Sequence, residues 1–242
     1  MNICNYSGIA DYYDKWCTGD KYYYPSMNFY LAYISKFSGV FAELGVGNGR
    51  IAVPLSRRQS TEVYGVDSCD TMLEHCARNI SSDTNLHLIK ADFMNFLLPV
   101  KADIIYMPFR TIGHIMTKNE LKDFFSNVRQ NLKKGGLFIF DHYMFDYKWA
   151  KMHNNVEILM YRDSRIRICD KYEYDFERNK MYCKVYVNDN PVTEFDFRWI
   201  DIEEIKDVCV QSGFSCVELF GDFDGSPWNL QSPNQIWVLK EE

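Results

Sequence analysis

Val40-Phe-Ala-Glu-Leu-Gly-Val-Gly-Asn-Gly-Arg50 joins an apolar run to three alternate glycines. Residues 40–44 predict a buried strand, and residues 50–58 predict a helix that follows the glycine turn. Glycines let a ligand approach the backbone closely, and a helix N-terminus offers N–H groups without partners. A strand, a glycine turn and a helix start therefore predict a nucleotide site at residues 45–50.

A second anchor for such a ligand is Asp67, which follows the apolar residues 62–66. It lies 67 − 45 = 22 positions after Gly45. A carboxylate at the end of the second strand can accept hydrogen bonds from both ribose hydroxyls of an adenosine. Asp67 is therefore the predicted ribose-binding residue.

Apolar strands alternate with helical patterns after residue 40, which predicts an α/β fold. We expect a Rossmann-like, seven-stranded, mostly parallel sheet with helices on both faces. Its expected strands are 40–44, 62–66, 86–89, 102–107 and 137–140, followed by an antiparallel pair at 214–220 and 235–240. Expected helices are 70–79, 120–132 and 201–212, the second of them ended by Lys133-Lys134-Gly135-Gly136. Chain order predicts right-handed crossovers, which bring the carboxyl ends of the parallel strands to one edge.

Two further segments are expected outside this sheet. The tyrosine-rich residues 1–38 predict a helical cap or lid, with a short helix at 9–16 and a longer one at 27–36. Alternating patterns within residues 156–200 predict an inserted antiparallel hairpin layer of two or three strands over the active site. Residues 1–242 are therefore expected to form a single domain.

Composition narrows the class of protein. The formal net charge is −6, which argues against a general nucleic-acid surface. No run of about 18 apolar residues predicts a membrane span, and the first residues lack the pattern of a signal peptide. Eight cysteines are scattered without a Cys-x-x-Cys pair. We expect reduced thiols, no metal, and a cytoplasmic protein.

Glu43, the acidic residue before the glycines, helps to decide between two possible nucleotide ligands. A dinucleotide fold uses Gly-x-Gly-x-x-Gly, whereas Arg50 here occupies the position of the third glycine. Glu43 would repel a pyrophosphate but suits a cationic ligand such as a sulfonium. The residues therefore favour S-adenosylmethionine (SAM) over NAD, and an NAD-linked oxidoreductase remains the alternative.

The same residues resemble the motifs of class I SAM-dependent methyltransferases, in the family's order and spacing. Residues 43–50 are similar to the first motif, Asp67 with Ser68 to the second, and residues 91–93 to the third. Residues 103–109 and 132–136 are similar to the segments around the fourth strand and before the fifth. The C-terminal part resembles a bacterial branch that acts on small molecules, and Ile112-Gly113-His114 resembles a segment of amino-sugar N-methyltransferases.

The resemblance implies a cofactor site that binds SAM and releases S-adenosylhomocysteine. In it, Glu43 and the glycine loop hold the methionine moiety, Asp67 binds the ribose, and Asp92 reaches the adenine amino group. Tyr13 closes over the cofactor, and Met107 and Pro108 line the path toward the acceptor. The full implied set is Tyr13, Glu43, Gly45, Val46, Gly47, Gly49, Arg50, Asp67, Ser68, Met72, Ala91, Asp92, Phe93, Met107 and Pro108.

The acceptor side is predicted from two residues after the fourth strand. His114 is a candidate base or acceptor-orienting group, with a structural histidine as the alternative. Arg110 is a candidate for binding an acceptor carboxylate or phosphate, with a fold-stabilising arginine as the alternative. Methyl transfer depends mainly on alignment and exclusion of water, so no fixed triad is required.

We therefore expect a SAM-dependent methyltransferase that acts on a nitrogen or oxygen of a small molecule. A non-catalytic SAM-binding protein is the alternative from another class. Neither a membrane nor a nucleic acid is expected as a partner, and a homodimer is left open.

Overall fold

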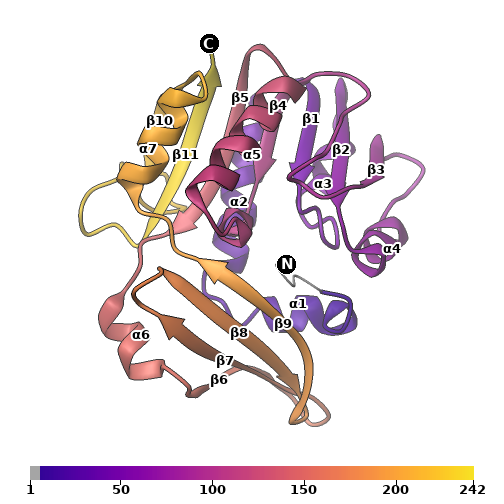
Figure 1. The fold of residues 1–242 in the computed structure, drawn as a ribbon. Helices are drawn as coiled ribbons and strands as arrows, with labels where there is room; N and C mark the ends of the chain where they lie inside the picture. Colours follow the sequence, from indigo (N-terminus) through magenta and orange to yellow (C-terminus); the bar gives the residue numbers. More distant parts are fainter. Residues whose placement is uncertain (1–5) are drawn as a thin grey trace.

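The computed structural model describes residues 6–242, which form two sheets and the helices packed on them (Figure 1). The larger sheet has seven strands in the order β10-β11-β5-β4-β1-β2-β3. Their bounds are β1 Gly39–Leu44, β2 Thr61–Asp67, β3 Leu86–Lys90, β4 Ala102–Met107, β5 Leu132–Tyr143, β10 Phe214–Phe220 and β11 Asn234–Glu241.

Strands β1 to β5 are parallel, and β11 runs antiparallel to both β5 and β10. The chain leaves β1 toward β2 and β3 and later returns to place β4 on the other side of β1. Such a reversal of strand order opens a crevice at the carboxyl ends of the two strands, where α/β proteins bind ligands. The predicted mostly parallel Rossmann-like sheet is confirmed.

Helices cover both faces of this sheet. Residues of α5 (Lys118–Asn131) and α7 (Ile202–Gln211) belong to one buried apolar cluster. Residues of α2 (Tyr23–Ile34), α3 (Ala52–Ser56) and α4 (Asp70–Arg78) belong to the cluster on the other face. Burial of both sheet faces explains why the strands are apolar on both sides rather than alternating.

The helix boundaries differ from the expected ones for local reasons. Pro54 lacks an N–H and is tolerated only in the first turn, so α3 begins at Ala52 and not at Arg50. Helix α2 likewise begins two residues before Pro25. Helix α5 begins early because Thr117 accepts a hydrogen bond from the Glu120 N–H (3.1 Å), which caps the helix.

The end of α5 was also predicted wrongly. The helix stops at Asn131, and Leu132 is already extended, so residues 133–136 lie inside β5 and do not form a glycine cap. The buried Asn131 side chain accepts a hydrogen bond from the Leu98 N–H (2.8 Å) and donates to the Phe96 carbonyl (3.3 Å). These bonds hold the end of α5 against the 96–98 loop, and β5 begins at the next residue, Leu132.

The second sheet has four antiparallel strands in sequence order, one more than the upper end of the prediction. They are β6 Glu157–Arg162, β7 Arg167–Asp175, β8 Lys180–Val187 and β9 Asn190–Arg198, preceded by α6 Tyr147–His153. The tight β8–β9 turn places Asn188 and Asp189 in the left-handed region, which these residue types tolerate. Figure 1 shows this sheet beneath the carboxyl ends of the parallel strands.

The N-terminal segment contacts both sheets. It contains a 3₁₀ turn, η1 (Ala10–Tyr12), and the short helix α1 (Tyr13–Cys17), while residues 1–5 of the predicted cap lie outside the described residues. Lys15 pairs with Asp163 beyond β6 (3.1 Å), and Asp14 accepts a hydrogen bond from Asn48 of the glycine loop. The segment therefore bridges the glycine loop and the four-stranded sheet. The division into one domain with a cap and an insertion stays a prediction.

Candidate cofactor and acceptor site

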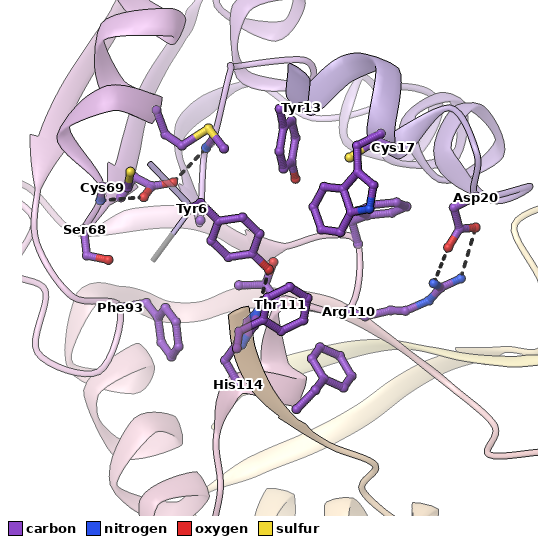
Figure 2. A pocket seen from close by; sticks show the side chains of 18 of the residues that line it. Tyr6, Tyr13, Cys17, Asp20, Ser68, Cys69, Phe93, Arg110, Thr111 and His114 are labelled. Carbon is purple, nitrogen blue, oxygen red and sulfur yellow. Dashed lines mark hydrogen bonds and ion pairs between the residues drawn. The ribbon is translucent and has the colours of Figure 1, made fainter. Parts of the chain in front are cut away.

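One large pocket lies between the carboxyl edge of the parallel strands and the four-stranded sheet, and the N-terminal segment forms part of its wall. It encloses about 1200 Å³ of empty space, open mouth included. Figure 2 shows Ser68 and Cys69 at one end of the pocket and the Asp20–Arg110 pair at the other, with Tyr6, Tyr13 and Phe93 between them. Elements distant in sequence thus build a single enclosure.

The glycine loop and Asp67 form the end of the pocket at β1 and β2. Gly45 and Gly47 have φ values of +72° and +55°, which L side chains rarely adopt. A Cβ on Gly47 would meet nothing within 4 Å, so open space lies over this turn. The Asp67 carboxylate accepts hydrogen bonds from the N–H groups of Gly47 and Cys69, both at 2.9 Å. These bonds fix the carboxylate and leave lone pairs for a ligand's hydroxyls.

Glu43 lies beneath this loop and is almost fully buried. Burial raises the pKa of its carboxyl to about 8, although the Arg50 charge and a hydrogen bond from the Tyr106 hydroxyl (3.0 Å) act in the opposite direction. Glu43 lines a small cavity next to the large pocket. It is therefore protonated at neutral pH in the free protein and would ionise in the presence of a ligand cation.

Arg50, which the resemblance implied as a cofactor-binding residue, makes its side-chain hydrogen bonds to helix α2. Its guanidinium donates to the Tyr23 carbonyl (3.0 Å) and to the Ser26 hydroxyl (3.1 Å), both on α2. It also lies over the rings of Tyr23 and Phe109, 4.9 Å from each centroid. Arg50 therefore connects α2 to the glycine loop. It lines the small cavity and not the large pocket.

A strained turn follows β4. Phe109 and Arg110 both have positive φ values, 59° and 65°, which is unfavourable for residues with a Cβ. The buried Asp141 at the end of β5 compensates by accepting hydrogen bonds from both backbone N–H groups, at 2.8 and 3.0 Å. It accepts a third from the Tyr30 hydroxyl (2.7 Å). Backbone strain held by the surrounding structure is typical of functional sites.

This turn places the Arg110 side chain in the pocket, but its charge is already paired. The guanidinium contacts the Asp20 carboxylate at 2.5 Å, and both side chains are largely buried. Its Nε atom is buried without a hydrogen-bond partner among residues 6–242. The pair joins the turn before α2 to the turn after β4, which favours the fold-stabilising alternative for Arg110.

His114 ends the 3₁₀ turn η2 (Thr111–His114) and lines the same pocket. Its Nδ1 lies 3.1 Å from the Asp196 carbonyl oxygen, which only accepts, so Nδ1 carries the proton. Nε2 then accepts a hydrogen bond from the Tyr6 hydroxyl at 2.9 Å. Burial lowers the pKa of the imidazole to about 4, so the ring is neutral at pH 7.

The four-stranded sheet supplies the opposite wall. The side chains it contributes are Met160, Asp170, Tyr172, Met181, Phe195 and Phe197. Gly113 allows η2 to approach this sheet, because a Cβ there would lie 2.1 Å from the Phe197 ring. The stacked rings of Tyr6 and Phe195, 5.5 Å apart, join the N-terminal segment to the sheet. Apart from Asp170, the wall is therefore aromatic or aliphatic.

Most of the residues implied for the site are brought together. The large pocket is lined by Tyr13, Gly45, Gly47, Asp67, Ser68, Met72, Ala91, Phe93, Arg110 and His114. The small cavity is lined by Tyr13, Glu43, Gly45, Val46, Gly47, Arg50 and Pro108.

Three implied residues line neither cavity. Gly49 lies against α4, where a Cβ would be 2.6 Å from the Cys76 sulfur. Asp92 is exposed and accepts a hydrogen bond from the Met94 N–H (2.9 Å). Met107 is fully buried in the apolar core, so the strand before the turn does not form the expected path to the acceptor.

Several pocket residues were missed by the sequence reasoning, chiefly Tyr6, Trp16, Cys17, Asp20, Thr111, Tyr143, Asp170, Phe195 and Phe197. The tyrosine-rich start and the alternating segment signalled a cap and a sheet. Neither pattern showed which side chains face the pocket, because that depends on how the two segments pack on the parallel strands.

Comparisons with known proteins place this fold in a class. Residues 41–136 match the family model of the methyltransferase domain. A Bacillus subtilis (strain 168) protein, YqeM, described as a candidate methyltransferase, is 23% identical over 137 residues, which are 56% of this chain and 54% of that protein. The chain thus spans about half the length of this curated relative.

Solved structures resemble the chain over nearly all of its length. A SAM-dependent methyltransferase from Clostridium acetobutylicum ATCC 824 has a TM-score of 0.81 at 18% identity, covering 98% of each chain. The CcbJ methyltransferase of Streptomyces caelestis has a TM-score of 0.82 at 19% identity, again covering 98% of each. CalS10, an amino pentose methyltransferase from Micromonospora echinaspora, has a TM-score of 0.67 at 15% identity and covers 100% of this chain and 99% of its own.

Residues 41–136 are therefore similar to the methyltransferase domain, and the described chain has the fold of SAM-dependent methyltransferases. The resemblance stated from the sequence is confirmed at this level. SAM is the cofactor of the class, and the open turn at Gly47 with the fixed Asp67 carboxylate fits an adenosine and its ribose.

Residues 6–242 contain no group of three or more His, Cys, Asp or Glu side chains that could hold a metal ion. No helix in that range is long and apolar enough to cross a membrane.

Proposed function

We propose that this protein transfers a methyl group from SAM to a nitrogen or oxygen of a small-molecule acceptor. One observation carries the proposal: the glycine loop and Asp67 share a single pocket with His114 and the aromatic wall of the four-stranded sheet. Such a pocket can hold a donor and an acceptor side by side, and alignment of the two is the main requirement of methyl transfer.

On the donor side, Asp67 accepts hydrogen bonds from the ribose hydroxyls, and the backbone of Gly45 and Gly47 allows close approach of the methionine part. SAM, when bound, supplies a methyl group activated by its sulfonium. Glu43 balances the ligand's positive charge beneath the loop. Met72 and Phe93 pack beside the adenosine, and Tyr13 covers it from the N-terminal segment.

On the acceptor side, His114 orients the acceptor through Tyr6 and does not act as the general base that removes the acceptor's proton. With a pKa of about 4, its imidazole is a weak base at neutral pH, whereas efficient general bases have pKa values close to the working pH. Its Nε2 fixes the Tyr6 hydroxyl, whose oxygen can accept a hydrogen bond from the acceptor. The aromatic walls exclude water from the transfer.

An oxidoreductase is disfavoured because Arg50 occupies the position of the third glycine of a dinucleotide-binding loop. A small acceptor is favoured by the pocket, which is bounded by both sheets and the N-terminal segment, and by the names of structural neighbours, one of which is an amino pentose methyltransferase. A cytoplasmic location and a homodimer remain predictions from the sequence.

Calorimetry with SAM and S-adenosylhomocysteine tests the proposal. We expect both to bind, and Asp67→Ala to weaken binding about 100-fold, since each hydrogen bond to a charged group contributes about 1.5–3 kcal/mol. Asp83→Ala is the control, because the exposed Asp83 lines neither cavity, and it should change affinity little.

Absence of binding by either compound, or equal affinity in wild type and Asp67→Ala, would refute the proposal. If SAM binds but no acceptor leads to the formation of S-adenosylhomocysteine, the non-catalytic SAM-binding alternative is favoured instead.

A further inference from the structure

Asp170 is a buried carboxylate in the acceptor half of the pocket to which neither the sequence nor the comparisons assign a role. It lies on β7, is 1% exposed, and lines the large pocket. The Trp16 indole N–H donates to Oδ1 (2.7 Å), and the Tyr172 hydroxyl donates to Oδ2 (2.6 Å). Two rings from different elements thus hold the carboxylate in a fixed orientation.

Among residues 6–242, no cation balances this carboxylate. Within this range, no Lys, Arg or His nitrogen lies within 4.0 Å of the Asp170 oxygens. Both hydrogen-bond donors are neutral groups. Buried charges in proteins are normally paired, because desolvation of a lone charge is costly.

The other charged groups of the pocket do not provide the partner. Its ionisable charges are Asp20, Asp67, Asp170 and Arg110, and Arg110 is already paired with Asp20. Asp67 lies at the cofactor end, where backbone N–H groups stabilise it. As residues 6–242 build it, the acceptor half therefore carries a negative charge at Asp170 that no cation of these residues balances.

The surroundings of Asp170 suit an organic cation. Trp16 and Tyr172 flank the carboxylate, and Tyr6 and Phe195 continue the same aromatic wall. Aromatic faces attract ammonium groups, and this attraction strengthens when water is excluded. A carboxylate has capacity for about four hydrogen bonds, and the protein uses two at Asp170.

We propose that Asp170 binds a protonated amino group of the acceptor, so that the substrates are small amines. A protonated nitrogen has no lone pair, so the atom that receives the methyl group is a neutral nitrogen or an oxygen of the same acceptor. This inference rests on the proposed function, since it names the acceptor class for the same pocket. The ammonium would donate hydrogen bonds to the free positions of the Asp170 carboxylate and lie against the Trp16 and Tyr172 rings. A neutral alcohol of the same shape would leave the buried charge without a partner.

The test compares matched amines and alcohols on the protein saturated with S-adenosylhomocysteine. The probe pairs are 2-phenylethylamine with 2-phenylethanol, D-glucosamine with D-glucose, and cyclohexylamine with cyclohexanol, and affinity is measured by ligand-observed NMR titration. In the wild type we expect the amine of at least one pair to bind about tenfold or more tightly than its alcohol, as expected for a charge-assisted hydrogen bond.

The variant Asp170→Asn keeps the shape and removes the charge. We expect it to lose the amine preference about tenfold while its affinity for S-adenosylhomocysteine stays unchanged. The matched control is Asp189→Asn, at the exposed β8–β9 turn of the same sheet, where asparagine tolerates the left-handed backbone. Tyr172→Phe, which removes one donor and keeps the charge, should retain the preference.

Each possible outcome either supports or overturns the inference about Asp170. A wild type that binds S-adenosylhomocysteine but shows no amine preference in any pair, including no binding at all, overturns the inference and leaves the proposed function standing. An Asp170→Asn protein that keeps the preference also overturns it, as does one that loses cofactor affinity equally. A wild type that binds neither SAM nor S-adenosylhomocysteine refutes the proposed function itself. The wild-type comparison does not depend on whether any variant folds.

Discussion

At the scale of single residues, the site is defined by carboxylates in different surroundings. Asp67 accepts hydrogen bonds from backbone N–H groups, and Asp141 accepts them from N–H groups and the Tyr30 hydroxyl. Asp170 accepts hydrogen bonds from two aromatic side chains. Burial raises the pKa of each of the three, to about 6 for Asp170. Their chemistry follows from these partners, and only Asp67 and Glu43 could be assigned from the sequence.

Glu43 carries a prediction about pH. Its carboxyl has a pKa of about 8 in the free folded protein against 4.5 ordinarily, because burial disfavours the charge. Between these values the folded state holds a proton that the unfolded state lacks, so this group's contribution to the free energy of unfolding falls as pH rises. A cationic ligand favours the ionised form, so SAM binding should release a proton and tighten up to about tenfold per pH unit below pH 8.

Calorimetry between about pH 6 and about pH 8.5, in two buffers of different ionisation enthalpy, measures this proton release. The variant Glu43→Gln should bind SAM more weakly at the upper end and with little pH dependence. An equally steep dependence in the variant would show that another group supplies the proton.

At the scale of elements, glycines decide how closely the N-terminal segment approaches the four-stranded sheet. A Cβ on Gly19 would lie 2.3 Å from the Met160 carbonyl oxygen, which belongs to the β6 backbone and cannot move independently. The nearby Lys15–Asp163 ion pair is partly exposed, and such pairs contribute about 0–1 kcal/mol. Close packing, rather than this ion pair, therefore keeps the segment in place.

Gly19→Ala should displace the N-terminal segment from β6. Overpacking of this kind costs about 1–3 kcal/mol, and the lost wall should weaken S-adenosylhomocysteine binding about tenfold or more. Limited proteolysis should show faster cleavage within residues 6–22. Thr18→Ala, at the neighbouring exposed position, is the control, and the same cleavage rate in both variants would contradict the packing account.

At the scale of the whole molecule, one pocket depends on three parts of the chain that are far apart in sequence. The parallel sheet provides the glycine loop and Asp67, the N-terminal segment provides Tyr6, Tyr13 and Trp16, and the four-stranded sheet provides the opposite wall. A ligand in this pocket contacts all three, so it should stabilise them together.

Hydrogen exchange measures that coupling. With S-adenosylhomocysteine at about 100 times its dissociation constant, linkage contributes about 2.7 kcal/mol, so exchange through openings that release the ligand should slow up to about 100-fold. We expect protection in residues 6–22, 108–114 and 157–198 as well as in the glycine loop. Protection confined to residues 43–50 and 67–72 would mean that the three parts do not act as one enclosure.

The seven-stranded fold could be predicted because each strand and helix has its own local pattern. The exceptions were local too: Pro54 and Pro25 shifted helix starts, and the Asn131 side chain ended α5 before the glycines. The cofactor end was accessible to prediction for the same reason, since Gly45, Gly47 and Asp67 lie directly at strand ends.

By itself, the sequence determined the α/β architecture, the glycine loop after the first strand and the carboxylate at the end of the second, because these depend on short patterns of polarity and backbone freedom. Only the tertiary structure decided the acceptor side. It paired Arg110 with Asp20, gave His114 its tautomer through the Asp196 carbonyl, and brought Asp170 within hydrogen-bond distance of the Trp16 indole. The reason is physical: these contacts join residues 82–154 positions apart, and such contacts depend on how whole elements pack.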